Sequence, residues 1–190
     1  MVQPPRIAER RIGARVLAIT EGDITRIRAD AIGNAANSAL SPGGGVDAAI
    51  HHAGGPAILL DLEARYGAMR HCPTGSAVVT GAGKLPATWV IHAVGPVWHG
   101  GVSGEADRLT AAYRSALRLA SELGARTLTL PAISCGVYGY PLDRGARVAL
   151  RAVAAFLAGP TTLERVTFVL FSRGTYDAFS TELAALPEEA

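Results

Sequence analysis

The sequence predicts an α/β sandwich with a mainly parallel or mixed sheet. Short segments rich in β-branched residues alternate with longer segments of helical periodicity, as in strands joined by crossover helices. The chain has 190 residues, of which 49% are apolar and 18% charged, and this composition can bury one substantial core. The length suits a single domain, which we place over residues 15–190 after an N-terminal lead-in over residues 1–14.

Six segments have the composition of strands. They are residues 15–19, 27–32, 78–79, 89–94, 127–130 and 166–171. In open α/β sheets, ligands bind at the carboxyl ends of the strands. The loops that follow these segments are therefore the places where a binding site is expected.

Three segments combine helical periodicity with a stop signal, and we expect helices there. They are residues 105–123, 143–158 and 175–186. Asp143 and Thr175 are the expected N-caps, while Gly124 and Pro187 are typical of the positions after a helix end. A further helix is expected to begin near Val46, directly after a run of glycines.

Charge and composition argue against several classes of function. Lys and Arg number 18 and Asp and Glu 16, so the net charge of +2 makes nucleic acid an unexpected partner. No uninterrupted apolar run approaches the length of a membrane span, and residues 1–15 lack the apolar stretch of a signal peptide. Cys72 and Cys135 have no metal-ligand spacing, so neither a disulfide framework nor a zinc site is expected. We expect a cytoplasmic protein without a metal or cofactor.

The standard sequence motifs for nucleotide binding and for a catalytic serine are absent from this sequence. No GxGxxG is present, and Leu85 follows Gly83-Lys84 where a P-loop needs Ser or Thr. Ala132 stands two residues before Ser134, where a nucleophile elbow needs glycine. These departures argue against a nucleoside triphosphatase, a Rossmann dehydrogenase and a serine hydrolase.

Two glycine-bearing loops each follow an expected strand and precede an expected helix. The first spans residues 33–50 and contains three consecutive glycines at 43–45. Such a run costs conformational entropy, but it allows close backbone approach and leaves N–H groups free to face an anion. The second spans residues 131–141. Either loop could be an ordinary turn, whereas the pair could hold both sides of a diphosphate.

Four polar side chains beside these loops have both a structural and a functional interpretation. Asp47, directly after the glycines, could reach a ligand or complement the first turn of a helix. Asp23 could form a turn or accept a hydrogen bond from the amino group of a base. Asn34 and Asn37 flank two alanines, and we expect one to be structural and the other to face a polyhydroxylated ligand.

The histidines and Cys135 are interpreted as structural. His51 and His52 lie in an expected helix and His92 in an apolar strand, where a satisfied histidine is the commoner finding. Cys135 has neither a helix start nor a basic neighbour before it that would favour a thiolate. We therefore interpret it as a small packing residue.

Six segments carry a resemblance to a known family. They are residues 22–25, 34–37, 43–51, 72–75, 90–96 and 134–141. In this order they resemble the macrodomain family, and within it the MacroD-type branch, which includes bacterial O-acetyl-ADP-ribose deacetylases. The resemblance extends from about residue 15 to about residue 186. It implies a three-layer α/β/α sandwich with a mixed central sheet, and a cleft for ADP-ribose.

The resemblance also implies a role for each matching residue. Asp23 would accept a hydrogen bond from the adenine amino group, Ile24 would pack nearby, and Phe171 would stack on the adenine. Asn37 would bind hydroxyls of the distal ribose and Asp47 would lie beside its anomeric carbon, so these two are the expected catalytic residues. The residues expected around the diphosphate are Gly44, Gly45, Val46, Ser134, Cys135, Gly136, Val137 and Tyr138, the last also against the distal ribose.

The implied activity is hydrolysis of an ester on the distal ribose. The substrates would be O-acetyl-ADP-ribose and proteins that carry mono-ADP-ribose on Asp or Glu. Asp47 would orient or activate the attacking water; in a competing account a substrate phosphate holds this water and Asp47 aligns the ribose. Some branches of the family bind ADP-ribose without hydrolysing it, so a non-catalytic reader is the alternative, and the pair Asn37 and Asp47 favours the enzyme.

Overall fold

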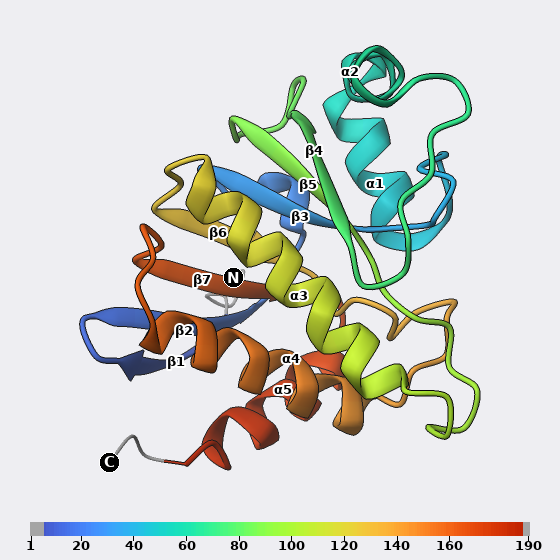
Figure 1. Cartoon of the computed structure of the whole chain (residues 1–190). Helices are drawn as coiled ribbons and strands as arrows, with labels where there is room; N and C mark the ends of the chain where they lie inside the picture. The colour runs from blue at the N-terminus through green and yellow to red at the C-terminus, as the bar shows by residue number, and fades with distance from the viewer. Residues whose placement is uncertain (1–5, 188–190) are drawn as a thin grey trace, which may run out of the picture.

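The computed structural model describes residues 6–187, which form a seven-stranded sheet with helices on both faces (Figure 1). The strands are β1 (Ile7–Ile12), β2 (Arg15–Glu21), β3 (Ala31–Ala36), β4 (Ala77–Gly81), β5 (Trp89–Val94), β6 (Thr127–Leu130) and β7 (Arg165–Leu170). Their order is β1-β2-β7-β6-β3-β5-β4. The five inner strands are parallel, while β1 and β4 are antiparallel edges. The sheet is therefore mixed, as predicted.

Helices cover both faces of this sheet. They are α1 (Gly45–Gly54), α2 (Pro56–Tyr66), α3 (Glu105–Glu122), α4 (Leu142–Ala158) and α5 (Arg173–Ala184), with the 3-10 helix η1 (Ile24–Arg26). The first two lie on one face and α3, α4 and α5 on the other, which confirms the three-layer α/β/α sandwich (Figure 1). Among the described helices, none has the length and apolar character needed to cross a membrane.

Each face of the sheet buries its own apolar cluster. Ile32 and Val90 pack under α1 and α2, whereas Leu128 and Phe168 pack under the other three helices. Successive side chains of a strand point to opposite faces, so one strand supplies both clusters. The central strands are consequently buried on both sides and present only their ends to solvent.

The strand after η1 begins later than the sequence predicted. A strand was expected over residues 27–32, but β3 runs from Ala31 to Ala36, so residues 33–36 belong to the sheet and not to the first glycine-bearing loop. Gly and Asn have low strand propensity, but pairing with β5 along the whole strand overrides it. A Cβ at Gly33 would lie only 2.6 Å from Cδ2 of Leu130, so glycine allows the close approach of β6.

The sequence predicted a lead-in over residues 1–14, but residues 7–12 form the strand β1. This strand pairs with β2 from Ile7 opposite Thr20 to Ile12 opposite Arg15, so the sheet begins well before residue 15. The charged residues of β1 do not have the composition of a strand, so the sequence did not predict it. Such residues are nevertheless typical of the edge strand of a sheet, where they oppose pairing with another chain. Residues 1–5 lie outside the described part of the chain.

Two helix caps differ from the prediction. The helix α4 begins after Pro141, so Asp143 lies in its first turn and is not its cap. The cap of α5 is Ser172, whose side chain accepts a hydrogen bond from the N–H group of Thr175. Thr175 was expected to be the cap itself. Sequence signals place helix ends only to within a few residues.

Candidate active site

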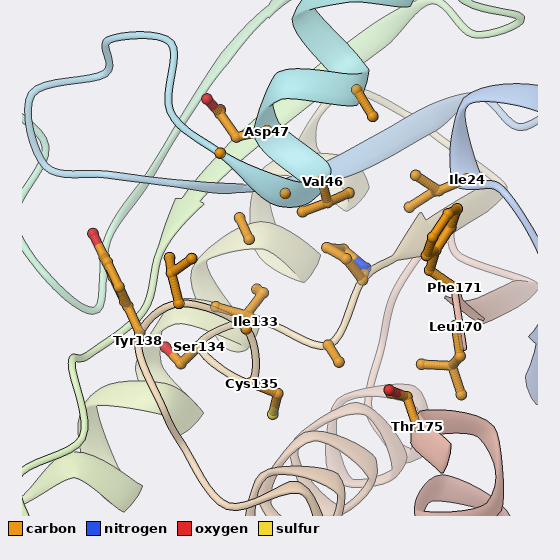
Figure 2. A pocket seen from close by; sticks show the side chains of 18 of the residues that line it. Ile24, Val46, Asp47, Ile133, Ser134, Cys135, Tyr138, Leu170, Phe171 and Thr175 are labelled. Carbon is orange, nitrogen blue, oxygen red and sulfur yellow. The ribbon is translucent and has the colours of Figure 1, made fainter. Parts of the chain in front are cut away.

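A cavity of about 660 Å³ opens where the carboxyl ends of β2, β3, β6 and β7 meet (Figure 2). Its volume is in the range of small-molecule sites. The structure brings together all the residues that the sequence assigned to a ligand, because each of them lines this cavity. They are Asp23, Ile24, Asn37, Gly44, Gly45, Val46, Asp47, Ser134, Cys135, Gly136, Val137, Tyr138 and Phe171.

The glycine run reaches the cavity at the start of α1. Gly45, the first residue of the helix, has a φ of 60°, which strains a residue with a side chain. Gly44 is the N-cap of α1, and no side chain at this position accepts a hydrogen bond from the first N–H groups of the helix. A Cβ at either glycine would meet nothing within 4 Å. The first N–H groups of α1 are therefore available to an anionic ligand, which the positive end of the helix also favours.

The loop after β6 holds a strained residue against the cavity. Ser134 has a φ of 66°, a left-handed conformation that costs an L-residue about 1–2 kcal/mol. Its buried Oγ has no hydrogen-bond partner among the described residues. The loop is nevertheless held in shape, because Tyr140 donates its N–H to the carbonyl of Ser134 at 3.0 Å. Strain of this kind persists where the surrounding structure enforces it, often at binding sites.

Asp47 lies at one end of the cavity with its carboxylate held by the protein. The Oδ2 atom accepts the N–H of Gly43 at 2.6 Å, and Oδ1 accepts Nδ2 of Asn34 at 2.6 Å. One turn along α1, Nε2 of His51 is 3.6 Å from Oδ1. Only 4% of Asp47 is exposed. Each carboxylate oxygen has more than one lone pair, so Asp47 can still accept a hydrogen bond from a ligand or water.

The two asparagines differ in burial and in their distance from the cavity. Asn34 is fully buried on β3, behind Asp47. Asn37 follows the end of β3 and lines the cavity. Its Nδ2 donates to the carbonyl of Ser41 at 2.7 Å, and its Oδ1 accepts the N–H of Ser41 at 3.3 Å. The second Nδ2 hydrogen of Asn37 makes no hydrogen bond with the described residues.

The far end of the cavity is formed by η1 and the end of β7 (Figure 2). Asp23 caps η1, since its Oδ1 accepts the N–H of Thr25 at 3.0 Å and the hydroxyl of the same residue at 2.7 Å. The ring of Phe171 is 85% exposed at the rim, near Ile24. An exposed ring beside an apolar wall is a surface on which a planar group can stack.

Cys135 and His92 have the surroundings of structural groups. Burial raises the pKa of the Cys135 thiol to about 12, which keeps it protonated and unreactive. His92 is buried between Asn34 and Thr80, and burial lowers its pKa to about 3. Within residues 6–187, no group of three or more His, Cys, Asp or Glu side chains is placed to hold a metal ion.

The cavity also contains residues that sequence reasoning did not single out as ligand contacts. Gly95 follows β5, Ile133 belongs to the loop after β6, and Ser172 and Thr175 lie at the start of α5. Nothing in their residue types distinguishes them. The available signal was their position just after strands whose ends had been predicted.

Fold and cavity together define an α/β protein whose ligand site lies at the carboxyl edge of a largely parallel sheet. The family model described as Macro domain matches residues 33–149 of this chain. The chain therefore belongs to the macrodomain family. The O-acetyl-ADP-ribose deacetylase of Klebsiella pneumoniae (strain 342) is 50% identical over 166 residues, covering 87% of this chain and 95% of the relative. Other relatives of similar identity are described only as macro domain-containing proteins.

Solved structures agree with this membership. The Oceanobacillus iheyensis macrodomain with ADP superposes with a TM-score of 0.90 at 35% identity, covering 96% of this chain and 97% of the other. The Trypanosoma brucei macrodomain in complex with ADP-ribose gives a TM-score of 0.79 at 37% identity, covering 87% of this chain and 68% of the other. The similarity therefore extends over nearly the whole chain.

Proposed function

We propose that this chain binds ADP-ribose in the cavity and hydrolyses an ester on its distal ribose. The substrates are O-acetyl-ADP-ribose and proteins that carry mono-ADP-ribose on Asp or Glu. The observation that carries the proposal is the Asp47 carboxylate, fixed by two hydrogen bonds at one end of a cavity that the start of α1 and the loop of residues 134–138 also line. A 50% identical relative named O-acetyl-ADP-ribose deacetylase supports it.

The ligand lies along the cavity with its adenine at the Phe171 end. The adenine stacks on Phe171 and donates its amino group to Asp23, both of which line that end. The diphosphate lies between the start of α1 and the loop of residues 134–138, where N–H groups and the helix terminus favour an anion. The distal ribose then reaches Asn37 and Asp47.

Hydrolysis requires a water molecule to attack the carbonyl carbon of the ester. The ester oxygen of the ribose leaves as the carbon–oxygen bond breaks, and it takes up a proton, so that a carboxylic acid and a free ribose hydroxyl are formed. Asp47 accepts a proton from the attacking water, or else it aligns the ribose while a diphosphate oxygen holds that water. Both accounts need the carboxylate where the structure has it.

A non-catalytic reader of ADP-ribose is the second candidate. It is favoured by the hydrogen bonds that occupy the two expected catalytic side chains, with Asn37 bonded to Ser41 and Asp47 to Gly43 and Asn34. A reader needs these side chains only to shape the ribose end of the cavity. The enzyme needs them to contact the substrate as well.

Two measurements on the same preparation test the proposal. Release of acetate from O-acetyl-ADP-ribose, and of ADP-ribose from a glutamate-modified protein, measures hydrolysis. Calorimetric titration with ADP-ribose, ADP and NAD measures binding. We expect both hydrolysis and binding of ADP-ribose; binding without release would identify a reader, and no binding would contradict the assignment of the cavity.

A further inference from the structure

Behind Asp47, buried polar side chains form a continuous chain of contacts. Nδ2 of Asn34 is 2.6 Å from Oδ1 of Asp47 and 3.1 Å from Nδ1 of His92. Nε2 of His92 is in turn 2.9 Å from Oγ1 of Thr80. None of the four residues is more than 4% exposed. The chain of contacts therefore leads from the cavity into the sheet, away from solvent.

The register of the sheet brings these residues together. Asn34 of β3 pairs with His92 of β5, and Thr80 of β4 stands two residues after Val78, the partner of His92. Because side chains alternate along a strand, all three point to the face covered by α1, which carries Asp47 in its first turn. Backbone pairing thus determines the arrangement.

The contacts determine where the hydrogens lie. The amide nitrogen of Asn34 has two hydrogens and faces two acceptors, while the reversed amide would place its oxygen against the Asp47 carboxylate. Nδ1 of His92 therefore accepts, and the ring proton is on Nε2, where it is donated to Thr80. Burial, and then the nearby His51, lowers the pKa of His92 to about 3 against a smaller opposing effect of Asp61, so the ring is neutral.

We propose that His92 is a positioning residue for the hydrolysis: its Nδ1 holds the amide of Asn34, which holds Oδ1 of Asp47 at the ribose end of the cavity. This inference rests on the proposed function, because that function gives Asp47 its role at the ester. His92 does not line the cavity and acts only through Asn34. An amide held by one acceptor can turn about its last side-chain torsion, whereas two acceptors define its plane.

Two substitutions separate the two nitrogens of the ring. In His92→Asn the side-chain oxygen can replace Nδ1 and accept from Asn34, whereas in His92→Gln the amide nitrogen can replace Nε2 and donate to Thr80. Loss of a hydrogen-bond partner that orients a metal ligand typically costs about 10–100-fold in affinity or activity, and a partner that orients the carboxylate of Asp47 should act on a similar scale. We expect His92→Gln to lower kcat by at least about tenfold and His92→Asn to retain most of the turnover. The Kd for ADP-ribose should change little in both.

Two buried strand threonines provide a matched control. Thr80→Val removes the acceptor of the Nε2 proton, and Thr129→Val removes a buried hydroxyl that has no partner among the described residues. Thr80→Val should lower kcat by a smaller factor than His92→Gln, and Thr129→Val should leave it unchanged. Equal losses in His92→Asn and His92→Gln, or losses that follow the free energy of unfolding, would overturn the role of His92.

A measurement on the wild-type protein does not depend on whether the variants fold. A two-bond proton–nitrogen NMR correlation at neutral pH should show His92 protonated at Nε2 and unprotonated at Nδ1. A proton on Nδ1, or a charged ring, would overturn the proposal. Acetate release by the wild-type protein is measured in the same series. If the wild-type protein releases no acetate, the proposed function is wrong. If it releases acetate and the two His92 variants lose activity equally, only the positioning role of His92 is wrong.

Discussion

The two ends of the cavity hold their side chains in opposite ways. At one end, Asp47 is 4% exposed and both of its oxygens accept hydrogen bonds from the protein. At the other end, the ring of Phe171 is 85% exposed at the rim. A group that acts on a bond must be oriented before the substrate arrives, because misplacement costs rate. A stacking ring gains its energy when the ligand covers it, so it stays open until then.

This difference predicts that the two ends affect different quantities. Changes at the Asp47 end should act mainly on turnover, and changes at the Phe171 end mainly on affinity. The proposed diphosphate site between them includes Gly44, Gly45 and Gly136, which have no side chain to remove.

The largest effect is expected for Asp47→Ala. Removal of the carboxylate should lower kcat for acetate release by at least about 100-fold, the usual contribution of a positioned acid–base group, and should weaken ADP-ribose binding far less. Kinetics and calorimetry on the same variant separate the two effects. Unchanged turnover would show that the catalytic assignment is wrong.

Two controls accompany this variant. Asp143→Ala removes an exposed aspartate from the first turn of α4, outside the cavity, and should leave both quantities unchanged. In Asp47→Ala the N–H of Gly43 and the amide of Asn34 lose their acceptor, which costs about 1–3 kcal/mol of stability. The free energy of unfolding is therefore measured, and turnover is compared only below the onset of unfolding.

The next largest effect is expected for Phe171→Ala. Loss of stacking on a base costs about 1–3 kcal/mol, so Kd for ADP-ribose should rise about tenfold, while kcat at saturation changes little. Because the ring is exposed, the free energy of unfolding should change by less than about 0.5 kcal/mol. Val102→Ala, at an exposed apolar residue outside the cavity, is the matched control. An unchanged Kd would place the adenine elsewhere.

A smaller effect is expected for Asp23→Asn, seen best as a change in base preference. The wild-type protein should bind the inosine analogue of ADP-ribose about fivefold more weakly than ADP-ribose. In that analogue a keto oxygen replaces the amino group from which Asp23 accepts a hydrogen bond. An amide can donate to that oxygen, so the variant should bind the two ligands about equally. The ratio of the two Kd values is the measurement, and it cancels any general loss of stability. The same ratio in wild type and variant would contradict the role of Asp23.

The smallest effect on turnover is expected for Glu105→Gln, because this carboxylate is buried outside the cavity. Burial alone raises its pKa, but the N–H groups of Glu105 itself and of Ser103, His99 and Gly101 together outweigh it and lower the pKa from 4.5 to about 2. A pKa depressed in the folded state means that stability is present above the unfolded pKa and is lost as pH falls.

Acid unfolding therefore tests Glu105. The wild-type protein should be more stable than Glu105→Gln at neutral pH, and this difference in the free energy of unfolding should shrink as pH falls from 4.5 toward about 2. Urea unfolding across this range measures it, with Glu122→Gln on the exposed surface as the control. A difference independent of pH would show that the ionised carboxylate does not hold the loop of residues 99–103.

The candidate contacts could be found in the sequence because the signals are local. The glycine run, Asp47 and the segment 134–138 each lie just after a strand or at the start of a helix, where chain position alone brings them to one edge of a sheet. The sequence could not show what holds them. Asn34, which holds Asp47, is 13 residues from it in the sequence, and His92, which contacts Asn34, is 58 residues from Asn34.

Two strands that differ from the prediction have a common cause. The charged β1 and the Gly- and Asn-containing β3 both lack the composition of a strand, and both are strands because neighbouring strands pair with them. Local propensity is a weak preference of about 1 kcal/mol across its whole range, and pairing in the sheet outweighs it.

By itself, the sequence determined the α/β architecture, the loops that carry the site and the residues that line the cavity, because these depend on short-range periodicity and on positions at strand ends. Only the tertiary structure decided that β1 and residues 33–36 join the sheet, and that a buried Asn34–His92–Thr80 chain stands behind Asp47. These features depend on the register between strands that are distant in the chain, and no local pattern encodes which side chains such pairing brings into contact.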